Sequence, residues 1–184
     1  MRHLFLPALA AVALADPATA QDAPRRDPIR QKFVEEARRL DQALKETEQD
    51  EDGVRLPKAV RAALLKPADG DDELTLLQKE RYNTTLVVLK LRYLRVLEGR
   101  DKLESVFEAA RKVLDAELAL SDEPAYQAAA REKFVELGRD FEKVFAERYE
   151  AGRAGLDELA DARGFRLEAE IALLKAKRKS ASPK

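Results

Sequence analysis

The sequence predicts an all-α protein built from long antiparallel helices, and three observations support this fold class. Charged residues make up 38% of the 184 residues, and Ala, Leu, Glu, Lys and Arg, which are strong helix formers, dominate the chain. Between Ala68 and Ser182 there is a single proline, Pro124. Apolar residues recur at steps of three and four, as on one face of a helix. Together these features favour a long-helix bundle or coiled-coil hairpins over any β structure.

The first twenty residues have the three parts of a secretory signal peptide. A short basic start, Met1 to His3, precedes an apolar run from Leu4 to Ala15, and Ala18 and Ala20 form a small-residue cleavage site. The run is too short to cross a bilayer. We therefore expect residues 1–20 to be removed and the protein to be exported to the periplasm, free or associated with the outer membrane. The mature chain then has no predicted transmembrane segment.

Residues 21–71 are predicted to hold a linker and short helices. A polar start leads into a helix from Pro28 to about Glu48, and a short helix over 57–65 would place Val60, Ala63 and Leu64 on one side. The acidic turn at 48–53 resembles the first half of a calcium loop. Ala59 stands where that loop needs its bidentate carboxylate, so we expect a solvated turn and no metal.

Residues 72–178 are predicted to form an antiparallel bundle of four helices. The predicted helices cover about 72–97, 101–120, 123–151 and 156–178, and Gly99, Asp101 and Pro124 supply stop, cap and start signals. The basic end, 179–184, is expected to be a disordered tail. The expected apolar stripes are Tyr82, Leu86, Leu89, Tyr93 and Val96; Val87, Leu91 and Leu94; Leu103, Val106, Phe107, Ala110, Val113 and Leu114; Phe134, Leu137, Phe141, Val144 and Arg148; and Leu159, Ala160, Leu167, Ile171 and Leu174.

The two halves of this bundle match each other at a shift of 53 residues. Gly99 and Arg100 fall on Gly152 and Arg153, and nine of the 22 positions from Gly99 to Leu120 are identical to their partners. We interpret residues 72–120 and 123–178 as two copies of one helical hairpin. Each copy would bury one stripe internally and cover a second stripe by packing on the other copy.

The segment from Arg148 to Arg163, with Tyr149, Gly152, Asp157 and Leu159 in order, resembles the Tyr-x-x-Gly…Asp-x-Leu-x-x-Ala segment of TolC-like outer-membrane efflux proteins. The resemblance covers the helical hairpin portion only, because this chain has no candidate barrel strands. In that family the segment lies at the periplasmic tip of a hairpin, where it meets the adaptor protein of an efflux pump. The resemblance implies partner-binding tips at Gly99, Arg100, Leu103, Tyr149, Gly152, Arg153, Leu156 and Asp157.

Composition excludes several other functions. The charges nearly cancel, with 34 basic and 35 acidic residues, so the basic excess typical of nucleic-acid binders is missing. There is no Cys, and the only histidine is His3. Without the commonest acid–base residue and metal ligands, we predict no enzymatic activity, metal or cofactor.

The leading hypothesis is an exported protein that binds an efflux or other transport component of the envelope. The alternatives are a helical module that binds a small molecule or polymer, and a coiled-coil homo-oligomer.

Overall fold

The computed structural model describes residues 57–181 together with residues 35, 38, 39 and 42, and it confirms the all-α prediction for this part of the chain. Its long helices are α2 (Glu73–Leu97), α3 (Leu103–Leu118), α4 (Pro124–Glu150) and α5 (Leu156–Ala181), and residues 57–181 contain no strand. The predicted signal peptide, most of the helix predicted over 28–48 and the acidic turn at 48–53 lie outside the described residues.

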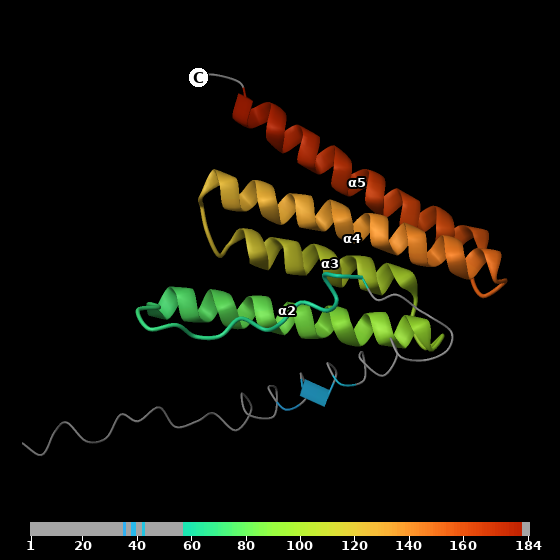
Figure 1. Cartoon of the computed structure of the whole chain (residues 1–184), viewed down its shortest axis with the longest axis horizontal. Coiled ribbons are helices and arrows are strands. Elements are labelled where there is room, and N and C mark those ends of the chain that lie inside the picture. Colours follow the sequence, from blue (N-terminus) through green and yellow to red (C-terminus); the bar gives the residue numbers. More distant parts are fainter. Residues whose placement is uncertain (1–34, 36–37, 40–41, 43–56, 182–184) are drawn as a thin grey trace, which may run out of the picture. The chain divides into compact units, whose positions relative to one another are not determined.

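The four helices lie side by side in chain order, and each runs opposite to the one before it (Figure 1). Helix α2 packs along α3, and α4 packs along α5. Helix α3 also contacts α4 and α5, so it joins the two pairs. As a result α3 is an inner helix with neighbours on both sides, whereas α5 is an edge helix.

Several helix ends follow the predicted signals. The Asp72 side chain accepts a hydrogen bond from the Thr75 backbone N–H at 2.8 Å and so caps α2, while Pro124 opens α4. The prediction that Asp101 caps α3 is wrong, because the N-cap position is Lys102 and no side chain caps this helix. Asp101 accepts a hydrogen bond from Arg92 of α2 at 2.6 Å instead, and this partner holds the pKa of Asp101 below its usual value. Helix α5 continues to Ala181, so the tail predicted from residue 179 begins helically.

The short helix predicted over 57–65 is wrong. Residues 57–61 form a turn, in which the Val60 backbone N–H donates to the Pro57 carbonyl at 2.9 Å, and no helix follows. The Asn83 side chain explains this, because its amide accepts from the Leu65 backbone N–H at 2.8 Å and donates to the Leu65 carbonyl at 2.9 Å. Both backbone groups of Leu65 are thus used outside any helix.

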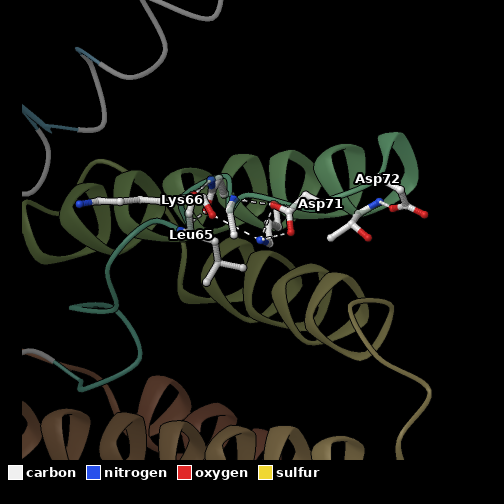
Figure 2. Close-up of polar contacts among 8 residues, drawn as sticks. Leu65, Lys66, Asp71 and Asp72 are labelled. Atoms are coloured by element: carbon white, nitrogen blue, oxygen red, sulfur yellow. Dashed lines mark hydrogen bonds and ion pairs between the residues drawn. The ribbon is translucent and has the colours of Figure 1, made fainter.

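The loop that follows this segment is tied to α2 by charged groups (Figure 2). The Lys79 ammonium lies 2.6 Å from one Asp71 carboxylate oxygen and 2.8 Å from the other, and it also reaches the Lys66 carbonyl at 3.4 Å. Asp71 accepts a further bond from the Ala68 backbone N–H at 2.8 Å. These contacts lower the pKa of Asp71 and hold the 57–72 segment against the helices.

The core is a chain of aromatic rings that links all four helices. Phe141 of α4 is fully buried. Its ring centroid lies 5.8 Å from that of Tyr93 on α2, 5.8 Å from that of Phe107 on α3 and 5.7 Å from that of Phe165 on α5. Phe107 and Phe165 stack at 4.5 Å. The predicted seam of α2 is buried as expected, with Leu89 and Tyr93 at 0% exposure.

Helices α4 and α5 come unusually close at one point. A Cβ placed on Gly138 of α4 would lie 2.9 Å from the Cα of Arg166 on α5, closer than van der Waals contact permits. The small residues Ala162 and Ala169 of α5 are buried nearby in sequence, at 0% and 3% exposure. Small residues on both helices therefore allow this close approach.

Candidate functional site

The two predicted tips, at Gly99 and Gly152, have the same local geometry. Gly99 has φ 69° and Gly152 has φ 68°, the left-handed conformation that ends many helices. In the first turn the Arg100 backbone N–H donates to the Arg95 carbonyl at 2.7 Å, and in the second Arg153 donates to Arg148 at 2.7 Å. These are Schellman turns at equivalent positions of the 53-residue shift.

Both turns lie at the same end of the helix set, at the right of Figure 1. Gly99, Arg100, Gly152, Arg153, Leu156 and Asp157 are exposed there, and Tyr149 is 43% exposed. Leu103 differs, because its side chain is only 4% exposed and belongs to the core. Leu103 is therefore corrected from a partner-binding candidate to a packing residue.

The charged groups of the tips interact locally. Arg100 lies 3.4 Å from the Glu98 carboxylate, and the Arg148 guanidinium donates to the Arg153 carbonyl at 3.4 Å. The Gly155 backbone N–H donates to the Glu158 carboxylate at 2.9 Å, which satisfies an open donor at the start of α5. These contacts shape the turns and leave their outer surface accessible.

An apolar stripe along α5 is exposed, although the sequence predicted three of its residues, Leu167, Ile171 and Leu174, to lie in the bundle; the fourth, Leu156, was predicted at the tip. Leu156 is 65%, Leu167 43%, Ile171 51% and Leu174 56% exposed; we call these four residues the α5 stripe. Helix α5 carries a second apolar face, which includes Phe165, and this face packs against its neighbours instead. The stripe extends over about 27 Å of helix.

The charges of α5 change sign along its length. The first half, 156–168, has four acidic and two basic residues, and the second half, 169–181, has one acidic and four basic residues. The net charges are therefore −2 and +3. Helix α5 therefore combines an exposed apolar stripe with a net charge that changes sign along the helix, and this difference between its two halves can favour one orientation of a partner.

A cavity of about 350 Å³ lies between the 57–65 segment and helices α2, α3 and α4. Its size is at the lower end of the range for small-molecule sites. The walls are mostly apolar, and they include Leu89, Val113 and Leu137 from three different helices. Lys58 and two small residues, Ala59 and Ala62, form the wall contributed by the 57–65 segment.

One acidic side chain in this cavity is almost fully buried. Glu117 is 9% exposed, and its carboxylate pairs with the Lys133 ammonium at 2.7 Å. The Lys133 side chain is 62% exposed, so it reaches the carboxylate from the solvent side. This pairing raises the pKa of Lys133. The Tyr82 side chain, 9% exposed, lines the same cavity.

The sequence contained a signal for this site that the predicted stripes did not include. Val106, Ala110 and Val113 of α3 step by four and three, and the next step of four reaches Glu117. A charged residue at a seam position is expected to be buried and to need a partner. The partner, Lys133, comes from the next helix, so its position depends on how α3 and α4 pack.

Because two tyrosines, Tyr82 and Tyr93, are buried, we predict that the folded protein loses stability at alkaline pH. Burial, together with the Glu117 charge, raises the pKa of Tyr82 from 10.0 to about 12, and burial raises that of Tyr93. In the unfolded chain these phenols lose their protons near pH 10, before they do so in the folded state. The stability that these two protonated phenols contribute is therefore fully present below pH 10 and is lost as the pH rises toward 12.

Thermal unfolding followed by circular dichroism between pH 8 and 12 measures this effect. The melting temperature should fall above pH 10, and absorbance at 295 nm should show tyrosines that ionise late. Tyr82→Phe should make the fall shallower, because it removes one of the groups concerned. An identical pH dependence in the variant would contradict the assignment.

Among the helices that the structure describes, none is both long and apolar enough to cross a membrane. Within the same residues no group of three or more acidic, Cys or His side chains could hold a metal ion.

Comparison with known proteins finds no family model, no curated protein and no solved structure that matches this chain.

Proposed function

We propose that the protein is an exported, non-enzymatic helical-hairpin protein whose last two helices bind a helix of another envelope protein. The observation that carries this proposal is the exposed α5 stripe. Four large apolar residues in a line cost free energy in water unless another surface covers them. Leu167, Ile171 and Leu174 are spaced by four and three residues, and Leu156 lies 11 residues, about three turns, before Leu167. This spacing fits the apolar seam of a second helix.

The charge gradient of α5 defines the partner's chemistry. Its first half is acidic and its second half is basic. A docked helix with basic residues opposite the first half and acidic residues opposite the second would be attracted to α5 along its whole length. A helix with the reversed order of charges would be repelled by both halves. The occupant we infer is therefore an amphipathic helix with an apolar seam and this order of charges.

The tip at Gly152 adds to this surface. Tyr149 and Leu156 are both exposed beside the turn, and Leu156 is also the first residue of the stripe. The resemblance of this segment to the tip of TolC-like proteins supports an efflux or secretion component as the partner. The equal geometry of the two turns supports the interpretation of the helix pairs as copies of one hairpin.

Synthetic helical peptides test the partner chemistry directly. One peptide carries a Leu seam with Lys opposite the first half of α5 and Glu opposite the second, and a control peptide has the two charge blocks exchanged. Fluorescence anisotropy with the full chain should show at least about tenfold tighter binding of the complementary peptide at low salt. Salt at 0.5 M should reduce this preference.

A matched pair of variants locates the binding surface. Ile171→Asp, on the stripe, should abolish peptide binding, whereas Ala172→Asp, at the exposed neighbouring position, should not. Equal binding of the two peptides, or unchanged binding by Ile171→Asp, would overturn the proposal.

Self-association is the competing occupant, since α5 itself has the required charge order when two copies run antiparallel. Sedimentation showing a dimer that Ile171→Asp dissociates would assign the stripe to a second copy and overturn the envelope partner. Cell fractionation tests export, and recovery of the full-length chain in the cytoplasm alone would overturn that part.

The cavity at Glu117 favours a second function, the binding of a small molecule inside the protein. This function uses different residues from the α5 stripe, so either can be tested without the other.

A further inference from the structure

The cavity beside Glu117 has the features of a ligand-binding site rather than those of a packing defect. Its walls come from three helices and from the 57–65 segment, which is held in place by the paired hydrogen bonds of Asn83 to Leu65. Apolar residues line most of it, and five of the fifteen lining residues are charged. A small apolar cavity with one buried charge is a common arrangement for binding an amphiphilic small molecule.

The buried charge in this cavity is negative. The Glu117 carboxylate is inside, at 9% exposure, while its counterion Lys133 extends from the surface with most of its side chain in water. An entering ligand therefore meets the carboxylate in the interior. The other charged lining residues are Lys58, Glu136 and Asp140, so the lining as a whole has three acids and two lysines.

An aromatic side chain lines the cavity together with this carboxylate. Tyr82, which is 9% exposed, and Glu117 are both lining residues. Tyrosine rings next to a carboxylate stabilise an organic cation, through their π faces and through hydrogen bonds. The same arrangement binds an anion much more weakly, because the Glu117 carboxylate repels it.

We propose that this cavity binds a small organic monocation with an apolar body, such as an alkylammonium. The ammonium group takes the place of the Lys133 ammonium at the Glu117 carboxylate, and the apolar body lies against Leu89, Val113 and Leu137. The exposed Lys133 side chain moves into solvent at little cost, since its charge stays hydrated. Binding is thus an exchange of one cation for another at a fixed carboxylate.

Three probes of equal chain length, octylammonium, octanoate and octanol, separate charge from apolar binding. Isothermal titration calorimetry on the full chain, below micelle concentrations, should show one saturable site. Octylammonium should bind at least about tenfold more tightly than octanoate, the difference expected from one charge-assisted hydrogen bond. The affinity for octanol should lie between those for octylammonium and octanoate.

Variants of the ion pair give opposite expected results. Glu117→Gln keeps a hydrogen-bonding group of the same shape, and it should remove the preference for octylammonium. Lys133→Met removes the internal competitor, and it should increase the affinity for octylammonium. Glu108→Gln, on the exposed side of the same helix, is the matched control and should change nothing.

A filling variant tests the location. Ala62→Leu places a larger side chain in the cavity wall and should weaken the binding of all three probes. Circular dichroism checks that the helices of this variant remain folded. Tighter binding of octanoate, an unchanged preference in Glu117→Gln, or the absence of saturable binding would overturn the proposal. Ile171→Asp should leave probe binding unchanged, so failure here is distinguishable from failure of the α5 stripe.

Discussion

Phe141→Ala is expected to destabilise the protein by about 3–5 kcal/mol, the usual cost of removing a buried ring. Phe141 is fully buried and contacts Tyr93, Phe107 and Phe165, which belong to the other three helices. Its loss leaves a cavity where all four helices meet. A domain of this size has only about 5–15 kcal/mol of stability, so the variant should lose a large part of it.

Chemical denaturation followed by circular dichroism at 222 nm measures this loss. Phe141→Leu should cost much less, because it retains most of the apolar volume. Tyr149→Ala is the control for an aromatic residue outside the core, since Tyr149 is 43% exposed, and its cost should stay within about 0.5 kcal/mol. Similar losses for Phe141→Ala and Tyr149→Ala would show that the aromatic cluster does not hold the helices together.

Gly138→Ala is expected to destabilise the protein, although Ala is the better helix former. The added Cβ would lie 2.9 Å from the Arg166 Cα, and backbone atoms cannot move aside as a flexible side chain can. Overpacking of this kind costs about 1–3 kcal/mol, which exceeds the gain of about 1 kcal/mol in helix propensity. Gly138→Val should be worse, because it adds two more methyl groups at the same contact.

Gly164→Ala is the matched control for this substitution. Gly164 is also inside a helix, and nothing lies within 4 Å of an added Cβ, so the change should stabilise the protein by about 1 kcal/mol. Thermal unfolding of the two variants side by side gives the test. If both variants are stabilised, helices α4 and α5 are not in close contact at Gly138.

The ion pairs that join α4 and α5 act around the same contact. Arg166 pairs with Glu142 of α4 and, at 2.9 Å, with Glu170 one turn along its own helix. Glu170 also lies 3.1 Å from Arg139, the residue after Gly138. These partners raise the pKa of Arg166 and lower that of Glu170. A wider gap at Gly138 would stretch this network as well as the apolar contact.

Local sequence signals determined the elements of this protein. Pro124 marks the start of a helix, Gly99 and Gly152 end helices in the left-handed conformation, and the seam from Tyr82 to Val96 is buried along α2. The start and the two ends depend on neighbours within a few residues, so the chain alone is sufficient to predict them. The spacing predicts the seam as an apolar face, and its burial comes from the packing of α2 along α3. The helix predicted over 57–65 failed because Asn83, 18 residues from Leu65, occupies the backbone groups that a helix needs.

Tertiary structure alone decided which apolar residues are covered. The 53-residue shift pairs Leu103 with Leu156, yet Leu103 is 4% exposed and Leu156 is 65% exposed. The sequence treats the two positions alike, but α3 has neighbours on both sides and α5 lies at the edge of the set (Figure 1). Burial depends on which helix lies opposite, and similarity between two positions in the sequence does not specify the helices that lie beside them.

The same reason separates the two candidate sites. The sequence by itself predicted one apolar stripe on α5, which included Leu167, Ile171 and Leu174 but not Phe165. That the face with Phe165 is buried and the α5 stripe is exposed is seen only in the packed structure, where small residues allow α4 and α5 to approach closely at Gly138. The pairing of Glu117 with Lys133 was likewise decided only when α3 and α4 packed, since a buried charge takes its partner from the nearest helix.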